Sequence, residues 1–308
     1  EYIFEPDYAD SMFNFNLSVK IYRSIVLITG TSSLSSKVVV LNEYRGWSNC
    51  IEISNAGTRV VISPQSGGRV LCYSVENENI LFEDREFDGY LLENFRKDRH
   101  WPDGARFDIG PEAIPGKLRD EPFMGVWDYK IINEYTVELS FSKDNRLGLH
   151  LKRTLTLNEH SSELYIKQSA RNYTEKCLNR HFWGRYFCKG GGRVVLPLSD
   201  NEVWGYMGNY QSDKVLTNNG KLCYNVSDET LKLGCNSRSG WISYLYKDLK
   251  FEVTFKVMPQ MDYSSTMGYT TIFYTNGKLC EIEPVSPLYK LSPGESFVFE
   301  QTWSLKKQ

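Results

Sequence analysis

The sequence predicts an all-β protein whose strands are mostly antiparallel and pack as a sandwich. Short segments rich in β-branched and aromatic residues follow one another, and no amphipathic helix of normal length comes between them. Turn-forming sequences separate these segments, as at Asn55-Ala56-Gly57 and Asn276-Gly277. Successive short strands without intervening helices favour an antiparallel sandwich over an alternating α/β fold.

Expected strands occupy most of the chain after residue 48. Their ranges are 49–54, 59–63, 70–76, 126–133, 136–142, 147–157, 162–171, 179–188, 193–197, 232–236, 241–247, 249–257, 270–275, 278–283 and 296–305. The 20 Tyr, 16 Phe and 7 Trp residues supply ample material for a sheet core. With no Pro-, Gly- or Ser-rich linker in this region, residues 45–308 are expected to form a single domain.

The first 44 residues form a separate N-terminal segment in this interpretation. Lys20 and Arg23 precede the apolar run 25–28 and the small-residue run 30–36, which is the order of an export signal. The segment could instead be disordered or add a strand, so both an exported and a cytoplasmic location stay open. No stretch reaches the roughly 18 apolar residues that a membrane-spanning helix needs.

Charge and cysteine patterns exclude several classes of function. The formal net charge is −2 with acidic and basic residues well mixed, so a nucleic-acid partner is not expected. The seven cysteines show neither Cys-x-x-Cys pairs nor zinc-ligand spacing, and we expect no metal site and no cofactor. They are typical of small buried residues, although one or two disulfides stay open. The sequence leaves the oligomeric state undetermined.

Two acidic residues near the C-terminus lie in an expected strand. Glu281 and Glu283 share one face of the segment 278–283 because successive strand residues point to opposite faces. Carboxylates are depleted in strands and repel one another. The pair therefore indicates either a solvated edge strand or a face that meets a cation or a hydroxyl-rich ligand.

A second strand carries a polar and aromatic face. Within the segment 179–188, the period of two places His181, Trp183 and Arg185 on one side. An imidazole, an indole and a guanidinium suit a polar, partly apolar ligand such as a sugar. The alternative is a half-buried histidine bonded to backbone.

The longest stretch without an expected strand covers residues 87–124. Loops of this length in a compact domain are functional or disordered, and the Trp, Phe, Arg and Asp content argues against disorder. Its His100, Trp101, Asp103 and Arg106 could complete a ligand pocket, or the loop could be structural and held by Arg–Asp pairs.

Several of these segments together resemble the galactose mutarotase-like superfamily, and most closely its aldose 1-epimerase-like branch. The residues that carry the resemblance are those of 53–55 and 60–70, the Trp101 loop, Ala170-Arg171-Asn172 ahead of His181, Glu281-Ile282-Glu283-Pro284, and Leu291-Ser292-Pro293-Gly294-Glu295. The resemblance runs from about residue 45 to residue 308. It implies a β-supersandwich whose concave sheet binds a mono- or oligosaccharide.

The resemblance also implies roles for individual residues. His181 matches the general acid of the mutarotases, Glu283 matches the base with Glu281 as the alternative, and Arg69 resembles a sugar-contacting arginine. A His/Glu pair can exchange roles in opening and closing a sugar ring. The sequence Arg180-His181-Phe182-Trp183 departs from the pattern of the better known enzymes. An aldose 1-epimerase-like enzyme, a non-catalytic carbohydrate-binding protein, and a polysaccharide lyase or hydrolase accessory therefore all stay open.

Overall fold

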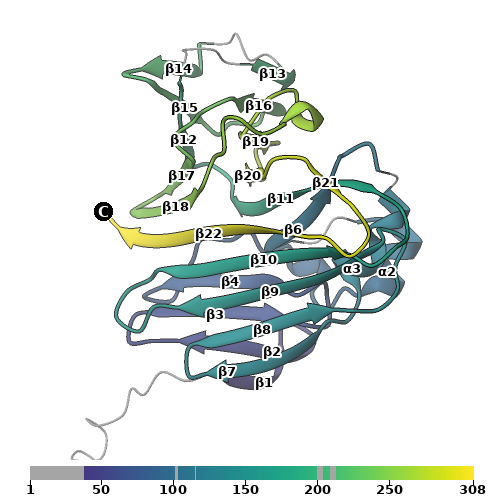
Figure 1. Cartoon of the computed structure of the whole chain (residues 1–308). Helices are drawn as coiled ribbons and strands as arrows, with labels where there is room; N and C mark the ends of the chain where they lie inside the picture. Colours follow the sequence, from purple (N-terminus) through teal and green to yellow (C-terminus); the bar gives the residue numbers. More distant parts are fainter. Residues whose placement is uncertain (1–37, 101–102, 115, 200–203, 209–212) are drawn as a thin grey trace, which may run out of the picture. The chain divides into compact units, whose positions relative to one another are not determined.

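The computed structural model describes residues 38–308 except 101–102, 115, 200–203 and 209–212. Among these residues strands predominate, and they form two large antiparallel sheets (Figure 1). The all-β sandwich expected from the sequence is confirmed. The expected export signal lies outside the described residues and stays a prediction.

The first sheet contains 12 of the described strands. Its main path is β1 (Val39–Tyr44), β2 (Trp47–Ser54), β3 (Thr58–Ser63), β4 (Arg69–Val75), β6 (Ala105–Gly110), β11 (Leu178–Lys189), β20 (Leu279–Pro284), β19 (Thr271–Thr275), β16 (Leu231–Cys235) and β13 (Trp204–Met207). Two short strands lie off this path: β5 (Glu78–Asn79) pairs with β4, and β21 (Tyr289–Leu291) pairs with β11. The sheet therefore places β11 next to both β6 and β20.

The second sheet contains 10 of the described strands. Their order is β14 (Val215–Asn218), β15 (Lys221–Asn225), β12 (Arg193–Pro197), β17 (Trp241–Tyr246), β18 (Leu249–Phe255), β22 (Ser296–Lys307), β10 (Leu164–Asn172), β9 (Leu149–Leu157), β8 (Thr136–Phe141) and β7 (Asp128–Asn133). Burial alternates along β9 and β10, as expected for strands with one face on a core and one on solvent.

The hydrophobic core joins the two sheets. Trp303 on β22 is fully buried, and its ring centroid lies 4.6 Å from that of Tyr186 on β11 and 5.9 Å from that of Phe107 on β6. Arg153 on β9 also crosses the core and donates to the carbonyl of Gly68 at 2.6 Å. The guanidinium lies over the Phe107 ring at 3.9 Å. The core thus covers one face of β6 and β11, which leaves their other face for a site.

The segment 87–124 is not the long loop that the sequence suggested. It contains α2 (Leu92–Asp98), β6 and α3 (Asp120–Met124), with short 3₁₀ turns at Arg85–Phe87 and Gly116–Leu118. β6 was missed because charged Arg106 and Asp108 alternate with apolar Phe107 and Ile109 in a segment bounded by glycines, and all six strand residues are buried. Its interior position makes it part of the floor of the site.

Other differences from the expected strands concern short strands, most of them at or near the edges of the sheets. β1 pairs with β2 although it precedes residue 45, and β13, β14, β15 and β21 were not expected from the sequence. These strands are at most six residues long, so periodicity alone gives little signal. All seven cysteines are free, so neither of the disulfides left open by the sequence is present.

Candidate functional site

The candidate site lies on the face of the first sheet that points away from the core, and we call it the site face. His181, Trp183 and Arg185 on β11 occupy this face, whereas Phe182 and Tyr186 on the opposite face of the strand belong to the core. The alternation follows from the period of two along a strand. The sequence pattern therefore gives β11 one aromatic core face and one polar face.

Pairing with the neighbouring strands brings further charged residues onto the site face. On one side of β11, Trp183 pairs with Asp108 and Arg185 pairs with Arg106 of β6. On the other side, Phe187 pairs with Glu281 of β20. Directly paired residues point to the same face of a sheet. The histidine strand and the acidic strand thus contribute to one surface, as the shared spacing of two residues suggested.

Four charged side chains form a network on the site face. The Nε and a terminal nitrogen of Arg185 both donate to Glu281, the latter at 3.1 Å. Arg185 also lies 3.5 Å from Asp108 Oδ2, and Arg106 donates to the same oxygen at 2.7 Å. Glu281, Asp108 and Arg106 are each at most 2% exposed. Such buried charges persist only where they are paired, and here each carboxylate faces a guanidinium.

A cavity of about 770 Å³ opens beside this network. Its lining combines the Arg185–Glu281 pair with aromatic rings, other polar groups and backbone. The lining residues are Phe82, Asp84, Phe87, Asp98, Arg99, His100, Arg185, Phe187, Tyr274, Asn276, Lys278, Leu279 and Glu281. The volume falls within the range of small-molecule sites, and the mixture of flat apolar rings with fixed donors and acceptors is typical of them.

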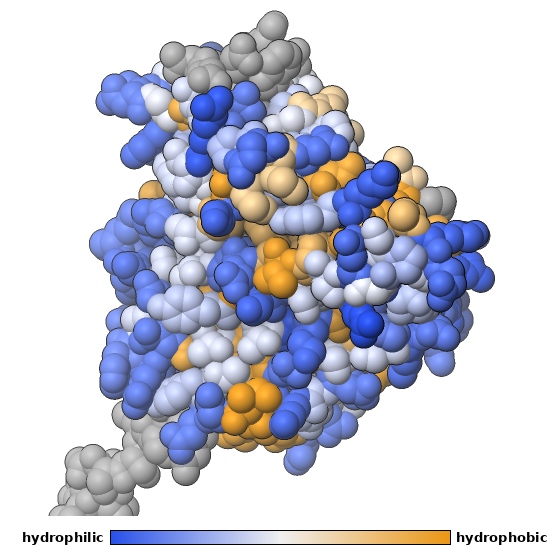
Figure 2. Space-filling model, in the orientation of Figure 1, coloured by the Kyte–Doolittle hydropathy of each residue, from blue (hydrophilic) through white to orange (hydrophobic). Residues whose placement is uncertain are grey.

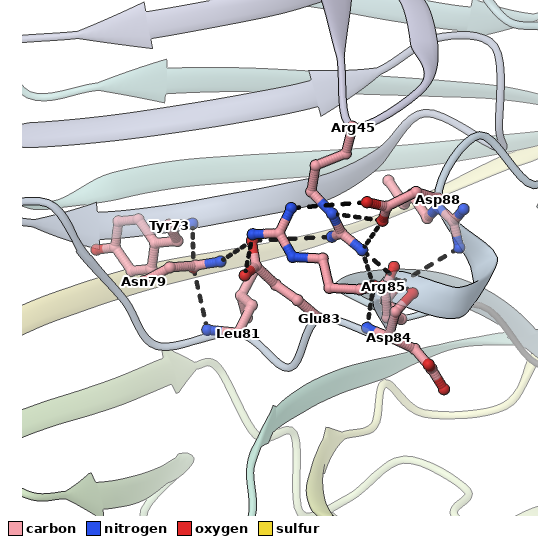
Figure 3. A network of polar contacts seen from close by, with 10 residues as sticks. Arg45, Tyr73, Asn79, Leu81, Glu83, Asp84, Arg85 and Asp88 are labelled. Atoms are coloured by element: carbon pink, nitrogen blue, oxygen red, sulfur yellow. Dashed lines mark hydrogen bonds and ion pairs between the residues drawn. The ribbon is translucent and has the colours of Figure 1, made fainter.

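A polar network fixes the segment that forms one wall of this cavity (Figure 3). Arg45 donates to the Asp88 carboxylate at 2.7 Å and to the Asp84 carbonyl at 3.4 Å, while Arg85 donates to Glu83 at 2.8 Å. Asp103 accepts from Arg45 and from the Asp84 backbone N–H, both at 2.6 Å. The network holds Asp84 and the stacked rings of Phe87 and His100 against the cavity.

The other end of the site face is closed. His181 and Trp183 are 1% and 3% exposed, and Glu283 is fully buried. The Trp183 indole N–H donates to Glu283 Oε2 at 2.6 Å, and Lys232 Nζ lies 3.8 Å from the same oxygen. A cavity of only about 100 Å³ remains here, lined by Glu112, His181, Trp183, Lys232, Ser265, Thr266, Met267 and Ile272. It is far smaller than the cavity at Arg185.

Burial shifts the two titratable groups of the closed end in opposite directions. Desolvation lowers the pKa of His181 from 6.5 to about 4, with the charge of Arg119 as a smaller contribution. Desolvation and the charge of Glu281 raise the pKa of Glu283 from 4.5 to about 8, against the attraction of Lys232 and Arg185. At neutral pH the imidazole is therefore neutral, and a proton on Glu283 is favoured.

The remaining predicted site residues are distributed around the site. Arg69 on β4 is 1% exposed, lies 5.0 Å over the Trp47 ring and donates to the Asp103 carbonyl at 3.4 Å. Burial lowers the Arg69 pKa to about 10. His100 lines the large cavity, whereas Asp103 belongs to the network behind its wall. Arg106 lies in the floor and not in a loop. Trp101 lies outside the described residues.

Sequence reasoning missed several residues of the site. Asp108 holds both Arg106 and Arg185, and its position two residues after Arg106 was the available signal once 105–110 is read as a strand. Lys232 on β16 reaches Glu283 from two strands away, and Tyr274 on β19 lines the large cavity. Their roles depend on the strand order, which the sequence pattern does not supply.

Two features are absent from the part of the chain that the structure describes. No group of three or more His, Cys, Asp or Glu side chains is arranged to hold a metal ion. None of the helices there has the length and apolar character required to cross a membrane.

Comparison with known proteins identifies the fold. A galactose mutarotase-like protein from Lactobacillus casei superposes with a TM-score of 0.59 at 10% identity, covering 83% of this chain and 100% of the other. A protein from Synechocystis superposes with a TM-score of 0.58 at 18% identity and 88% and 99% coverage. A Klebsiella pneumoniae protein provisionally named aldose 1-epimerase gives 0.59 at 12% identity and 87% and 82% coverage.

No protein-family model matches the sequence, and no curated protein matches it. The similarity is therefore one of structure, and at such low identity it establishes the fold alone. The chain has the galactose mutarotase-like fold, in agreement with the resemblance found in its sequence motifs. A shared fold does not identify the ligand, which depends on the residues of the site itself.

Proposed function

We propose that the protein binds a saccharide in the cavity at the Arg185–Glu281 pair. The observation that carries this proposal is the combination, in about 770 Å³, of a fixed ion pair with several aromatic rings, among them Phe87, Phe187 and Tyr274. Sugars present hydroxyl groups at their edges and C–H groups on their faces. Guanidinium and carboxylate groups match the former, and aromatic rings match the latter.

The ion pair is prepared for this task by its surroundings. Glu281 is 1% exposed, whereas the Arg185 side chain retains 20% exposure toward the cavity. Asp108 holds Arg185 from the opposite side at 3.5 Å. Because the geometry is set before a ligand arrives, little conformational entropy is lost on binding. The pair would offer donors and acceptors to neighbouring sugar hydroxyls.

Thermal unfolding with a sugar panel tests this proposal. Neutral hexoses, pentoses, uronates and sugar phosphates would be added to the wild-type protein. At least one class should raise Tm in a concentration-dependent way, because a ligand at 100 times its Kd stabilises the folded state by about 2.7 kcal/mol. Arg185→Lys should abolish most of the shift, since lysine lacks the planar fork of donors. Arg193→Lys, at an exposed position on β12, serves as the matched control.

A panel in which no sugar raises Tm would contradict saccharide binding. Equal protection of the wild type and Arg185→Lys would place the ligand elsewhere on the molecule.

A second candidate function is that of an aldose 1-epimerase, and the opposite pKa shifts of His181 and Glu283 favour it. A protonated Glu283 could donate a proton to the ring oxygen while neutral His181 accepts the proton of the anomeric hydroxyl. The ring C–O bond breaks and the aldehyde forms. Ring closure on the other carbonyl face returns both protons, so the reaction is balanced without a co-reactant.

The closed end must widen for this chemistry. Glu283 is fully buried beneath the Trp183 indole, and about 100 Å³ does not accommodate a sugar ring with its hydroxyls. The Trp183–Glu283 hydrogen bond would have to break when a substrate enters. The cavity at Arg185, in contrast, is already open to a ligand, so saccharide binding needs no such rearrangement.

Polarimetry separates the two candidates. An epimerase should accelerate the change in optical rotation of a freshly dissolved aldose, and His181→Asn or Glu283→Gln should lower the rate at least roughly 100-fold. A binding protein would give thermal protection while the rotation followed the buffer rate. Acceleration that both variants retain would exclude these two residues as the acid and the base.

A further inference from the structure

A second surface with ligand-binding character lies on the outer face of the second sheet, which is turned toward the viewer in Figures 1 and 2. Five residues on adjacent strands form a straight row across it, and we call this row the outer stripe. Its members are Trp241 on β17, Thr254 on β18, Thr302 on β22, Tyr165 on β10 and Thr156 on β9.

The strand register establishes the row. Trp241 pairs with Thr254, Thr254 with Thr302, Thr302 with Tyr165, and Tyr165 with Thr156. Paired residues share a face, so all five side chains project to the same side. Three strand spacings separate Trp241 from Tyr165, which amounts to ~14 Å at about 4.8 Å per strand.

The stripe is accessible and hollowed. Tyr165 is 43% exposed, Thr254 is exposed, and the other three members are partly exposed. A cavity of about 710 Å³ lies over it, and its lining includes all five residues. Charged residues flank the row, and two of them, Lys167 and Glu300, pair with each other at 3.3 Å. The Tyr165 hydroxyl donates to Glu163 at 2.8 Å, which restricts the orientation of the ring.

We propose that the outer stripe is a binding site for an uncharged polysaccharide chain. Two aromatic rings at a spacing of ~14 Å are too far apart to grip a single sugar ring, and they suit successive units of a chain. The threonine hydroxyls between them can donate and accept hydrogen bonds along the chain. The salt bridge between Lys167 and Glu300 reduces the charge beside the row, which suits a neutral chain better than a polyanion.

This site is separate from the cavity at Arg185, because the two lie on different sheets and share no lining residue. The inference does not depend on what that cavity binds. A protein with both features would hold a polymer on one sheet and engage a sugar on the other.

Affinity electrophoresis tests the outer stripe with soluble starch, hydroxyethyl cellulose, xylan and galactomannan as neutral probes and alginate as a charged one. At least one neutral probe should retard the wild-type protein. Trp241→Ala and Tyr165→Ala should each weaken that binding roughly tenfold or more, the loss of about 1.4 kcal/mol that a stacked ring can supply. Thr254→Lys, which places a long charged side chain between the two rings at an exposed position, should do the same without removing a ring.

Two control variants make the result specific. Tyr129→Ala removes a tyrosine that is 40% exposed on β7 of the same sheet, outside the stripe, and should bind as the wild type does. Glu229→Ala, which breaks an exposed pair with Lys214 and lines neither cavity, should likewise retain polysaccharide binding. Thermal unfolding of each variant identifies any loss that comes from misfolding.

Three outcomes would overturn the proposal. The first is that none of the neutral probes retards the wild-type protein. The second is that alginate binds more tightly than every neutral probe. The third is that sedimentation shows a dimer that Thr254→Lys dissociates, because the stripe would then be an interface between two copies of the chain.

Discussion

The two ends of the site face both carry charged and aromatic side chains, but one end is open and the other is closed. At one end Arg185 and Glu281 form an ion pair that borders about 770 Å³ of open space. At the other end, two residues away along both β11 and β20, Trp183 covers a fully buried Glu283 and leaves about 100 Å³. The strands are the same at both ends, so the difference comes from the segments that cover them.

The covering segments differ in what they leave exposed. The 3₁₀ turn Ser264–Thr266 and the following Met267 lie over the closed end, where they line the small cavity with His181. At the open end, Asp84 and the Phe87–His100 stack form a wall and not a lid. One sheet therefore presents an accessible ion pair and a concealed pair of titratable groups side by side.

The largest effect should follow loss of the carboxylate at the open end. In Glu281→Ala, Arg185 would lose the carboxylate that accepts from two of its nitrogens, and removing one partner of a buried ion pair typically costs about 3–5 kcal/mol of unfolding free energy. Urea denaturation measures this loss. Glu229→Ala, which breaks an exposed pair with Lys214, should change stability by less than about 1 kcal/mol. Equal losses of unfolding free energy in the two variants would show that the network at Arg185 stabilises the fold no more than an exposed ion pair does.

The closed end should lose stability as the pH rises from 4.5 to about 8. Because the Glu283 pKa is about 8 in the folded state and 4.5 in the unfolded state, the folded protein holds this proton more tightly. Its contribution is complete below pH 4.5 and disappears as the pH rises through 8. Glu283→Gln should remove this decline, which we expect to be on the order of 2–4 kcal/mol. Parallel stability–pH profiles of both proteins would contradict the burial argument.

His181 should affect the stability of the fold at acidic pH. Its folded pKa of about 4 lies below the unfolded value of 6.5, so its contribution is complete above pH 6.5 and is lost as the pH falls through 4. His181→Asn should flatten the profile in this window by up to ~3 kcal/mol. Denaturation at closely spaced pH values gives the slope, and His160→Asn, at an exposed site, is the control. A slope unchanged in His181→Asn would mean that the imidazole is hydrated.

The smallest effect concerns the packing of His181. It pairs with Gly110, and a Cβ added to this glycine would lie 1.8 Å from His181 Nε2. Gly110→Ala should therefore displace the ring and lower the unfolding free energy by about 1–3 kcal/mol. Gly57→Ala, where nothing lies within 4 Å of the added atom, should leave stability within about 1 kcal/mol of the wild type. Thermal denaturation of both variants compares them directly.

The fold and part of the site could be predicted from the sequence. Alternation along 179–188 and 278–283 predicted that His181, Trp183 and Arg185 share a face, and likewise Glu281 and Glu283. Local periodicity sufficed there because both strands have one apolar face in the core. The strand β6 was not recognised, because its Arg106 and Asp108 are buried by pairing and resemble a polar loop in the sequence.

Closure at Glu283 could not be predicted from local patterns. It depends on Lys232, whose Nζ lies 3.8 Å from Glu283 Oε2, and on Thr266, which lines the small cavity with His181. These residues come from a strand and a turn that only the strand order brings near β11. The open cavity likewise needs Tyr274 and Phe87, which lie far apart in the chain. Periodicity assigns a residue to a face, and tertiary contacts decide whether that face is covered.

The position of β22 has a consequence for protein synthesis. This strand pairs with β10 on one side and β18 on the other, so it fills the middle of the second sheet although it is the last strand described. Until the ribosome has released residues 296–307, β10 and β18 have no common neighbour and their edges stay available to other chains. A nascent chain of this protein would therefore benefit from a chaperone until β22 is inserted.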